Sequence, residues 1–271
     1  MDPDEVIQKI EDVEIQGATS VARAGVELLQ SLEGEGRGQA ELAAVEERLR
    51  EERPTEPLLF NALDAADVMG YDAVLDHIEE AQAAVTGHGR DLVNEGDTIY
   101  THCHSSTVTA LLRDAADTEF AVHVTETRPL YQGRTTAEEL ADADIPVTLY
   151  VDAGARLALE DTDAMFIGAD AVTGDGAVVN KIGSGMIAET AAARDIPVYV
   201  FADSWKLADE MTVERRGAAE VWAGAPEGVE VANPAFERVS PEHITAIVSE
   251  LGRHQPNTFM AAARDAYPEV L

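Results

Sequence analysis

The chain has 271 residues, with 52 acidic and 19 basic side chains and a formal net charge of −33. This length fits one large domain or two smaller ones, and 45% hydrophobic residues suffice for a buried core, so wholesale disorder is excluded. No apolar run approaches the ~18 residues of a membrane span, and the first residues show no secretory signal. One cysteine excludes an internal disulfide and a CxxC metal knuckle. We expect a cytoplasmic protein that does not bind membranes.

Acidic residues are spread along the whole chain, whereas lysine occurs only at positions 9, 181 and 206. So many like charges repel at low salt, and salt removes that penalty by shortening the Debye length to ~3 Å at 1 M. The composition therefore predicts a halophilic protein. Such a surface disfavours direct nucleic-acid binding, which needs basic patches, and a phosphorylated substrate would need a local basic pocket.

The first 95 residues predict a helical N-terminal domain, because apolar residues recur there with helical spacing. The expected helices are Gly17–Leu32, Gln39–Arg50, Pro57–Gly70 and Tyr71 to about Val85. Gly87, His88 and Gly89 are expected to form a flexible joint.

Residues 96–271 predict a Rossmann-like α/β domain, a parallel sheet covered by helices, because short β-rich runs alternate with helical stretches. The expected strands are Thr98–His102, Phe120–Val124, Val147–Val151, Ala164–Gly168 and Val198–Phe201. The expected helices are Thr107–Ala116, Ala137–Ala143, Ala155–Leu159, Met186–Arg194 and Ser240–Leu251, the last with Ser240 as its cap.

Ligands bind at the carboxyl ends of the strands in an open parallel sheet, which makes Cys103 a candidate. It follows a strand and precedes a helix that Ser105 or Ser106 could cap, and a thiol near a helix N-terminus has a lowered pKa. On position alone we favour the alternative of a small buried hydrophobic residue. His102 and His104 have no third ligand with matching spacing, so no metal site is expected.

Two acids also follow strands. Asp170 comes directly after Ala164–Gly168, and Asp152 follows Val147–Val151. Each could serve as a general acid or base, and each could equally cap a turn, which is the more common role.

Two of the three lysines map to this same edge of the sheet. Lys181 precedes a turn with Gly183 and Gly185 that leads into a helix, and Lys206 follows a strand. Glycines at a helix start let backbone N–H groups approach a phosphate, and lysine suits a phosphate as a point charge. The alternative is two surface lysines placed by chance.

The remaining cations have plainer readings. Arg128 could bind a phosphate or pair with Glu126, and the pairing is the default. Arg23 and Arg53 lie in the helical half, and arginines at such positions are more often solvated than functional.

Five segments, in this order, resemble one superfamily. It contains methylthioribose-1-phosphate isomerase, archaeal ribose-1,5-bisphosphate isomerase, and the regulatory alpha, beta and delta subunits of initiation factor 2B. The segments are THCHSS (101–106), TETRPLYQGRTTAEEL (125–140), FIGADAVTGDGAVVNKIGSGMIA (166–188), VFADSWK (200–206) and ANPAFERVSPEHI (232–244). The resemblance runs from about Glu14 to Leu251 and is greatest to the archaeal ribose-1,5-bisphosphate isomerase-like proteins.

The resemblance implies a catalytic pair, Cys103 and Asp170, which the regulatory subunits usually lack. The implied substrate-binding residues are Gln16, Gly17, Ala18, Thr19, Arg53, Ser105, Ser106, Asn180, Lys181 and Lys206, the last for a phosphate. Four positions depart from the family pattern. Gln16 stands where the isomerases carry arginine, His104 and Ser106 stand where ribose-1,5-bisphosphate isomerase has asparagine and lysine, and Glu237 replaces an aspartate of the last segment.

These features predict an aldose–ketose isomerase for a C1-phosphorylated ribose, in which Asp170 is a general acid and Cys103 moves the C2 proton, with no metal or organic cofactor. The alternative is a non-catalytic, initiation factor 2B-like subunit that binds a translation-factor partner or a phosphorylated metabolite. A nucleotide-binding α/β domain ranks last because the glycine-rich motifs are missing. The resemblance also implies a homodimer or higher homo-oligomer.

Overall fold

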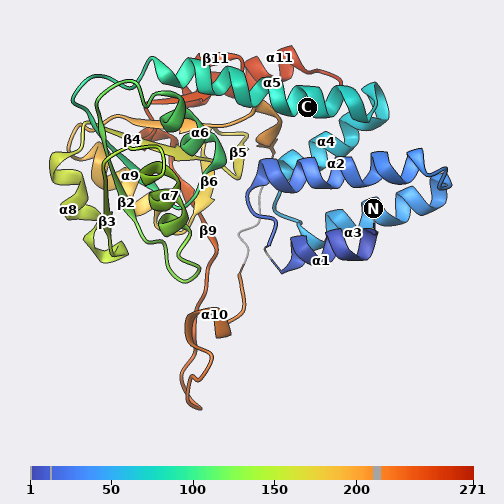
Figure 1. The fold of residues 1–271 in the computed structure, drawn as a ribbon, viewed down its shortest axis with the longest axis horizontal. Helices are drawn as coiled ribbons and strands as arrows, with labels where there is room; N and C mark the ends of the chain where they lie inside the picture. The colour runs from blue at the N-terminus through green and yellow to red at the C-terminus, as the bar shows by residue number, and fades with distance from the viewer. Residues whose placement is uncertain (1, 13, 210–214) are drawn as a thin grey trace.

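The structure, a computed structural model, describes residues 2–12, 14–209 and 215–271. Its N-terminal region is helical, as predicted, and its helices form the layer drawn in blue and cyan in Figure 1. They are α1 (Pro3–Glu11), α2 (Ala18–Gly34), α3 (Gln39–Glu52), α4 (Pro57–Met69) and α5 (Tyr71–Arg90).

The helical layer is held together by apolar faces with helical spacing. On α2, Val21, Leu28 and Leu32 are fully buried, and they pack in one cluster with side chains of α1, α3, α4 and α5. Trp205, from the sheet region, belongs to the same cluster and is also fully buried. The two regions therefore share a core.

A mainly parallel sheet follows, and within the described residues it has seven strands in the order β11-β10-β7-β4-β1-β2-β3. Among the described strands of this sheet, only β11 is antiparallel to its neighbour, β10. The strands are β1 (Thr98–His102), β2 (Ala121–Thr125), β3 (Val147–Tyr150), β4 (Ala164–Gly168), β7 (Val198–Phe201), β10 (Ala246–Ser249) and β11 (Gly252–His254).

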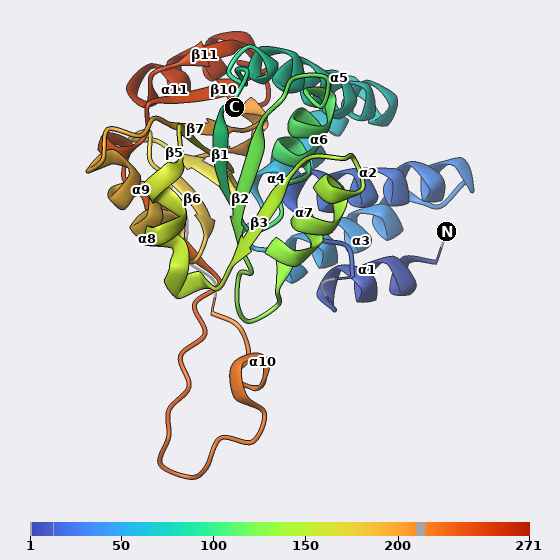
Figure 2. The same cartoon turned by 60° about the vertical axis from the view of Figure 1, so that its left-hand side comes forward.

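Helices connect these strands and cover the sheet, as the two views show (Figures 1 and 2). The connecting helices are α6 (Ser106–Asp114), α7 (Gln132–Ala141), α8 (Ala155–Ala158) and α9 (Ser184–Ala192). Apart from these, α11 (Pro256–Ala266) follows β11, and α10 is Ala219–Trp222. The segment that carries α10 extends away from the rest of the molecule in both figures. Of the helices in the described ranges, none is long and apolar enough to span a bilayer.

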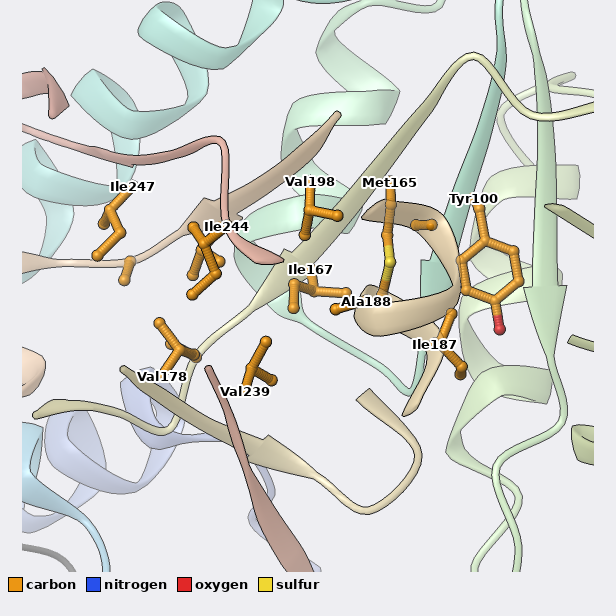
Figure 3. Close-up of a cluster of buried hydrophobic side chains, with 14 of the residues drawn as sticks. Tyr100, Met165, Ile167, Val178, Ile187, Ala188, Val198, Val239, Ile244 and Ile247 are labelled. Atoms are coloured by element: carbon orange, nitrogen blue, oxygen red, sulfur yellow. The ribbon is translucent and has the colours of Figure 1, made fainter. Parts of the chain in front are cut away.

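A second, smaller sheet was not predicted. Its order is β8-β5-β6-β9, with β5 (Ala171–Thr173), β6 (Val178–Lys181), β8 (Leu207–Ala208) and β9 (Phe236–Val239). Two of these strands have three residues or fewer, which is too short to show an alternating pattern in sequence. Its apolar side packs on the main sheet and α9, where Val178 and Val239 face Ile167 and Ile187 (Figure 3).

The helix predicted for Ser240–Leu251 is wrong. A single 3-10 turn (Pro241–His243) is followed by β10, which lies between β11 and β7 in the sheet. Every residue of β10 is buried. A strand buried on both faces shows a continuous apolar run, which sequence periodicity does not separate from a helix.

The flexible joint predicted at residues 87–89 is also wrong, because these residues form the last turn of α5. Gly89 is buried, and a Cβ atom there would lie 1.9 Å from Leu111 Cδ1 and 2.6 Å from Phe201 Cε1. The glycine permits the close approach of α5 to α6 and β7.

Candidate functional site

A pocket with an empty volume of about 790 Å³, its open mouth included, lies between the helical layer and the carboxyl ends of the strands. β1, β4 and β7 are neighbours in the sheet, so the segments that follow them meet at this edge. The pocket is lined by every residue assigned above to catalysis or substrate binding: Gln16, Gly17, Ala18, Thr19, Arg53, Cys103, Ser105, Ser106, Asp170, Asn180, Lys181 and Lys206.

Cys103 has an unusual backbone. Its φ angle of 67° lies in the left-handed region, which costs a residue with a side chain roughly 1–2 kcal/mol. Two threonines hold it there: the Cys103 N–H donates to Thr127 Oγ1 at 3.0 Å, and Thr136 Oγ1 donates to the Cys103 carbonyl at 2.9 Å. Strain that the surroundings maintain in this way is typical of functional sites.

The thiol of Cys103 does not have the lowered pKa that its position suggested. Burial raises the pKa of Cys103 to about 11, and the charge of Lys181 lowers it only in part. Ser105 does cap α6, as predicted, by accepting a hydrogen bond from the Val108 N–H at 3.3 Å. Desolvation therefore outweighs the helix terminus, and the thiol is protonated at neutral pH.

Asp170 lies two residues after the end of β4 and lines the pocket together with Cys103. Its backbone N–H donates to the Val179 carbonyl at 2.9 Å, and its negative charge contributes to the raised pKa of Cys103. Between the two segments, a Cβ atom on Gly168 would lie 2.4 Å from Ser105 Oγ, so glycine is required for this close approach. A thiol and a carboxylate thus line the same pocket.

Several cationic side chains line the pocket, although the chain as a whole is strongly acidic. Arg53 is 7% exposed and Lys206 is 5% exposed, and neither forms an ion pair with a carboxylate among the described residues. Lys206 Nζ donates to the Ala169 carbonyl at 2.7 Å, and Lys181 Nζ lies 4.7 Å from the centre of the Phe236 ring. Because buried charges are normally paired, these cations indicate a site for an anion.

The N-terminus of α2 also borders the pocket. Gly17, at φ 81°, is its N-cap and provides no side-chain cap, and Ala18 and Thr19 continue the pocket wall. The first N–H groups of a helix lack intrahelical partners and favour anions. Together with Arg53 this helix end offers N–H donors to an anion on the helical side of the pocket, where the buried Glu56 is also part of the lining.

The phosphate cradle predicted at Gly183 and Gly185 is wrong. The Glu237 carboxylate caps α9 instead, accepting hydrogen bonds from the Gly183 N–H at 2.8 Å and the Gly185 N–H at 2.7 Å. Neither glycine lines the pocket. Asn180, just before this turn, donates to Ser184 Oγ at 2.9 Å and does line it.

Asp152 has the capping role that the sequence analysis gave as an alternative. Its carboxylate accepts hydrogen bonds from the Thr127 N–H at 2.8 Å and the Arg128 N–H at 2.7 Å. The default pairing of Arg128 with Glu126 is wrong, because Arg134 forms the ion pair with Glu126 at 2.7 Å. Arg128 instead lies over the ring of Tyr131 and contacts its hydroxyl group.

The two histidines beside Cys103 have separate partners. His104, at the pocket, lies 3.2 Å from Glu139 Oε1, whereas His102 is buried and bonds to Thr125 and Ile182. Arg23 does not line the pocket. In the part of the chain that the structure describes, one group has metal-ligand spacing: His77, Asp203 and Glu250, none of which lines this pocket.

Sequence reasoning missed several residues of the pocket. They are Glu56, Thr107, Leu130, Gln132, Arg216 and Phe236. Leu130, Gln132 and Phe236 fall inside segments that resemble the superfamily, and Glu56 and Thr107 lie close in sequence to the implied residues Arg53 and Ser106, so proximity to those positions was an available signal. Arg216, which pairs with Glu220 at 2.6 Å, lies in no motif and gave none.

Comparison with known proteins adds independent findings. Residues 14–256 match the initiation factor 2 subunit family. The chain is 34% identical to a ribose 1,5-bisphosphate isomerase of Haloterrigena turkmenica, over 97% of this chain and 93% of that protein. It is 39% identical to a methylthioribose-1-phosphate isomerase of Pelotomaculum thermopropionicum, over 66% and 58%. A solved structure of Pyrococcus horikoshii translation initiation factor eIF-2B is similar with a TM-score of 0.85 and 26% identity, over 94% and 97%.

Proposed function

The chain belongs to the initiation factor 2 subunit family, and from that premise we propose that it is an aldose–ketose isomerase for a C1-phosphorylated ribose. One observation carries the proposal: a strained, buried thiol and a carboxylate line a pocket that also holds buried cations without carboxylate partners among the described residues. The relatives named as ribose 1,5-bisphosphate and methylthioribose-1-phosphate isomerases support a sugar phosphate as substrate.

A sugar phosphorylated at C1 cannot open its ring by losing a hemiacetal proton, so a proton must be supplied to the ring oxygen. The raised pKa of Cys103 favours the thiol as that donor and leaves the role of base to Asp170. The thiol proton goes to the ring oxygen as the C1–O bond breaks, and Asp170 takes the proton from C2.

The resulting enol then becomes the ketone. Asp170 returns its proton to C1, and the C2 hydroxyl gives its proton to the Cys103 thiolate. Each group ends in the protonation state in which it began, so the cycle is balanced by two residues without further reagents. This assignment reverses the roles given in the sequence analysis, because burial keeps the thiol protonated.

Different cations of the pocket are proposed to contact different parts of the substrate. In our proposal Arg53 and the N-terminus of α2 bind one phosphate, and Lys181 and Lys206 lie on the side of the reacting groups. Gln16 and Ser106 line the pocket where isomerases carry arginine and lysine. We therefore expect weaker binding of a second phosphate than in an enzyme with the full set of cations.

The second candidate is a regulatory subunit without catalysis. The similarity to the translation initiation factor eIF-2B structure favours it, as do the cations replaced at Gln16 and Ser106. It predicts that ribose phosphates or a translation-factor partner bind without turnover. A homodimer or larger oligomer in the cytoplasm is proposed for either function.

Protection of the Cys103 thiol from alkylation distinguishes among the candidate ligands. In molar salt, Cys103 is alkylated with iodoacetamide in the presence of ribose-1,5-bisphosphate, methylthioribose-1-phosphate, AMP or inorganic phosphate. We expect the sugar phosphate that is the substrate to slow labelling most and to be converted in parallel samples. Labelling that no phosphorylated sugar slows would contradict the proposed site.

A further inference from the structure

His102, the residue before the thiol, is 3% exposed and both ring nitrogens have partners. Nδ1 lies 2.7 Å from Thr125 Oγ1, and Nε2 lies 2.8 Å from the Ile182 carbonyl oxygen. Thr125 Oγ1 in turn lies 3.0 Å from the Tyr100 hydroxyl group. The Tyr100 ring is part of the core between the sheets and α9 (Figure 3).

The chemistry of these groups fixes the direction of every proton. A carbonyl oxygen can only accept, so His102 Nε2 carries the hydrogen and donates to Ile182. In the neutral ring Nδ1 is then an acceptor, and the Thr125 hydroxyl donates to it. Thr125 Oγ1 accepts in turn from Tyr100. Burial lowers the pKa of His102 and raises that of Tyr100, which keeps both groups neutral.

The chain of hydrogen bonds ends at the turn that carries a pocket cation. Ile182 lies between Lys181, which lines the pocket, and Gly183, the N-cap of α9 at φ 105°. A Cβ atom on Gly183 would lie 2.8 Å from His102 Nε2, so the ring packs directly against this turn. His102 therefore connects the strand of the thiol to the turn of the lysine.

We propose that His102 is a positioning residue that holds the Ile182 carbonyl and thereby fixes the Lys181 ammonium group relative to the Cys103 thiol. The proposal deepens the proposed function, since it rests on these two side chains belonging to one site. It has a consequence that does not depend on turnover: the lysine charge favours the thiolate, so thiol reactivity reports the lysine's position.

A double-mutant cycle on alkylation of Cys103 tests this. Iodoacetamide labelling at fixed pH in molar salt is compared for wild type, His102→Leu, Lys181→Met and the double variant. Without the lysine charge the pKa of the Cys103 thiol rises further, and we expect labelling to be slower by about tenfold. We expect His102→Leu to show the same defect, and the double variant to be no slower than Lys181→Met alone.

Three further variants keep the test sharp. His102→Gln, whose amide N–H can donate to Ile182, should recover most of the wild-type rate. Thr125→Val removes the hydroxyl that fixes the tautomer and should slow labelling, but not in the Lys181→Met background; it replaces His102→Leu if that variant does not fold. Tyr100→Phe, the matched control, removes only the outermost link and should leave the rate unchanged.

Two results would overturn the proposal, because each indicates a merely structural role for His102. In the first, the double variant is slower than Lys181→Met by the same factor by which His102→Leu is slower than the wild type. In the second, His102→Leu is labelled faster, with or without Lys181. Turnover of ribose-1,5-bisphosphate is measured separately on the same samples. Absence of turnover in the wild type contradicts the isomerase, whereas the labelling cycle decides the role of His102 in either case.

Discussion

The two sides of the pocket are built on different physical principles. On the sheet side, Cys103 is held in a left-handed backbone conformation by hydrogen bonds between its backbone and two threonine side chains. On the helical side, Arg53 is buried beside an uncapped helix end without an ion-pair partner among the described residues. Proton transfer needs exact placement of the reacting groups, whereas anion binding needs charge removed from water. The molecule assigns these tasks to different regions.

Removing the reacting groups of the sheet side should have the largest effect. Cys103→Ser and Asp170→Asn are expected to lower kcat about 10²–10⁴-fold, the usual contribution of a positioned acid or base. The melting temperature and the affinity for inorganic phosphate should change little in both variants, because the proposed anion site lies on the other side of the pocket. Undiminished turnover in either variant would refute the roles assigned here.

The environment of the thiol should also be visible in its pH dependence. The pKa of Cys103 is raised from 9.0 to about 11, so the thiol stays protonated until the pH approaches 11. Labelling of the free protein should therefore rise about tenfold per pH unit from pH ~8 to ~10 without a plateau. Since the unfolded chain would ionise first, the same shift reduces stability as the pH rises from about 9 to 11. A plateau below pH ~9 would show an activated thiolate instead.

On the helical side, Arg53→Met should separate binding from stability. Loss of a charged hydrogen bond, about 1.5–3 kcal/mol, predicts phosphate or sugar-phosphate affinity lower by about 10- to 100-fold. Stability should be unchanged or higher, because an unpaired cation no longer has to be buried. Arg23→Met, at a partly buried arginine outside the pocket, is the matched control. Equal loss of affinity in both variants would argue against a local anion site.

The packing of α5 between the two regions can be tested with a pair of glycines. Gly89→Ala places a methyl group against Leu111 and Phe201 and should destabilise the fold by about 1–3 kcal/mol. Gly87→Ala, two residues earlier on the same helix, has nothing within 4 Å and should stabilise by up to about 1 kcal/mol. Chemical denaturation in molar salt measures both. Equal effects of the two substitutions on stability would instead support the flexible joint predicted for residues 87–89.

Salt should stabilise both regions alike, because acidic residues are spread along the whole chain. With a net charge of −33, the melting temperature is expected to rise by several degrees from low salt to molar potassium chloride. A melting temperature independent of salt would contradict the halophilic character predicted from composition.

Sequence reasoning succeeded where one physical signal dominated. The strand Ala164–Gly168 and the cysteine and aspartate at strand ends were found because apolar runs and motif spacing are local features. It failed where distant segments decide the outcome. The sequence of residues 240–251 predicts a helix, whereas the structure forms β10 there, and its burial on both faces hides the period of a strand.

The chemistry at the site shows the same limit. Glu237 occupies the N–H groups expected to cradle a phosphate, although it is 52 residues away from Gly185. Likewise the pKa of Cys103 rises because burial outweighs its place beside a helix terminus. Which pocket residues meet could be predicted from the motifs, but their hydrogen-bond partners and desolvation could not.

The most direct test follows ribose-1,5-bisphosphate by phosphorus NMR in molar salt, with wild-type protein and with Asp170→Asn. We predict that the wild type converts the sugar to the ketose bisphosphate, and that the variant broadens the substrate signals by binding but does not convert it. Conversion by the variant at the wild-type rate, or binding without conversion by the wild type, would contradict the account.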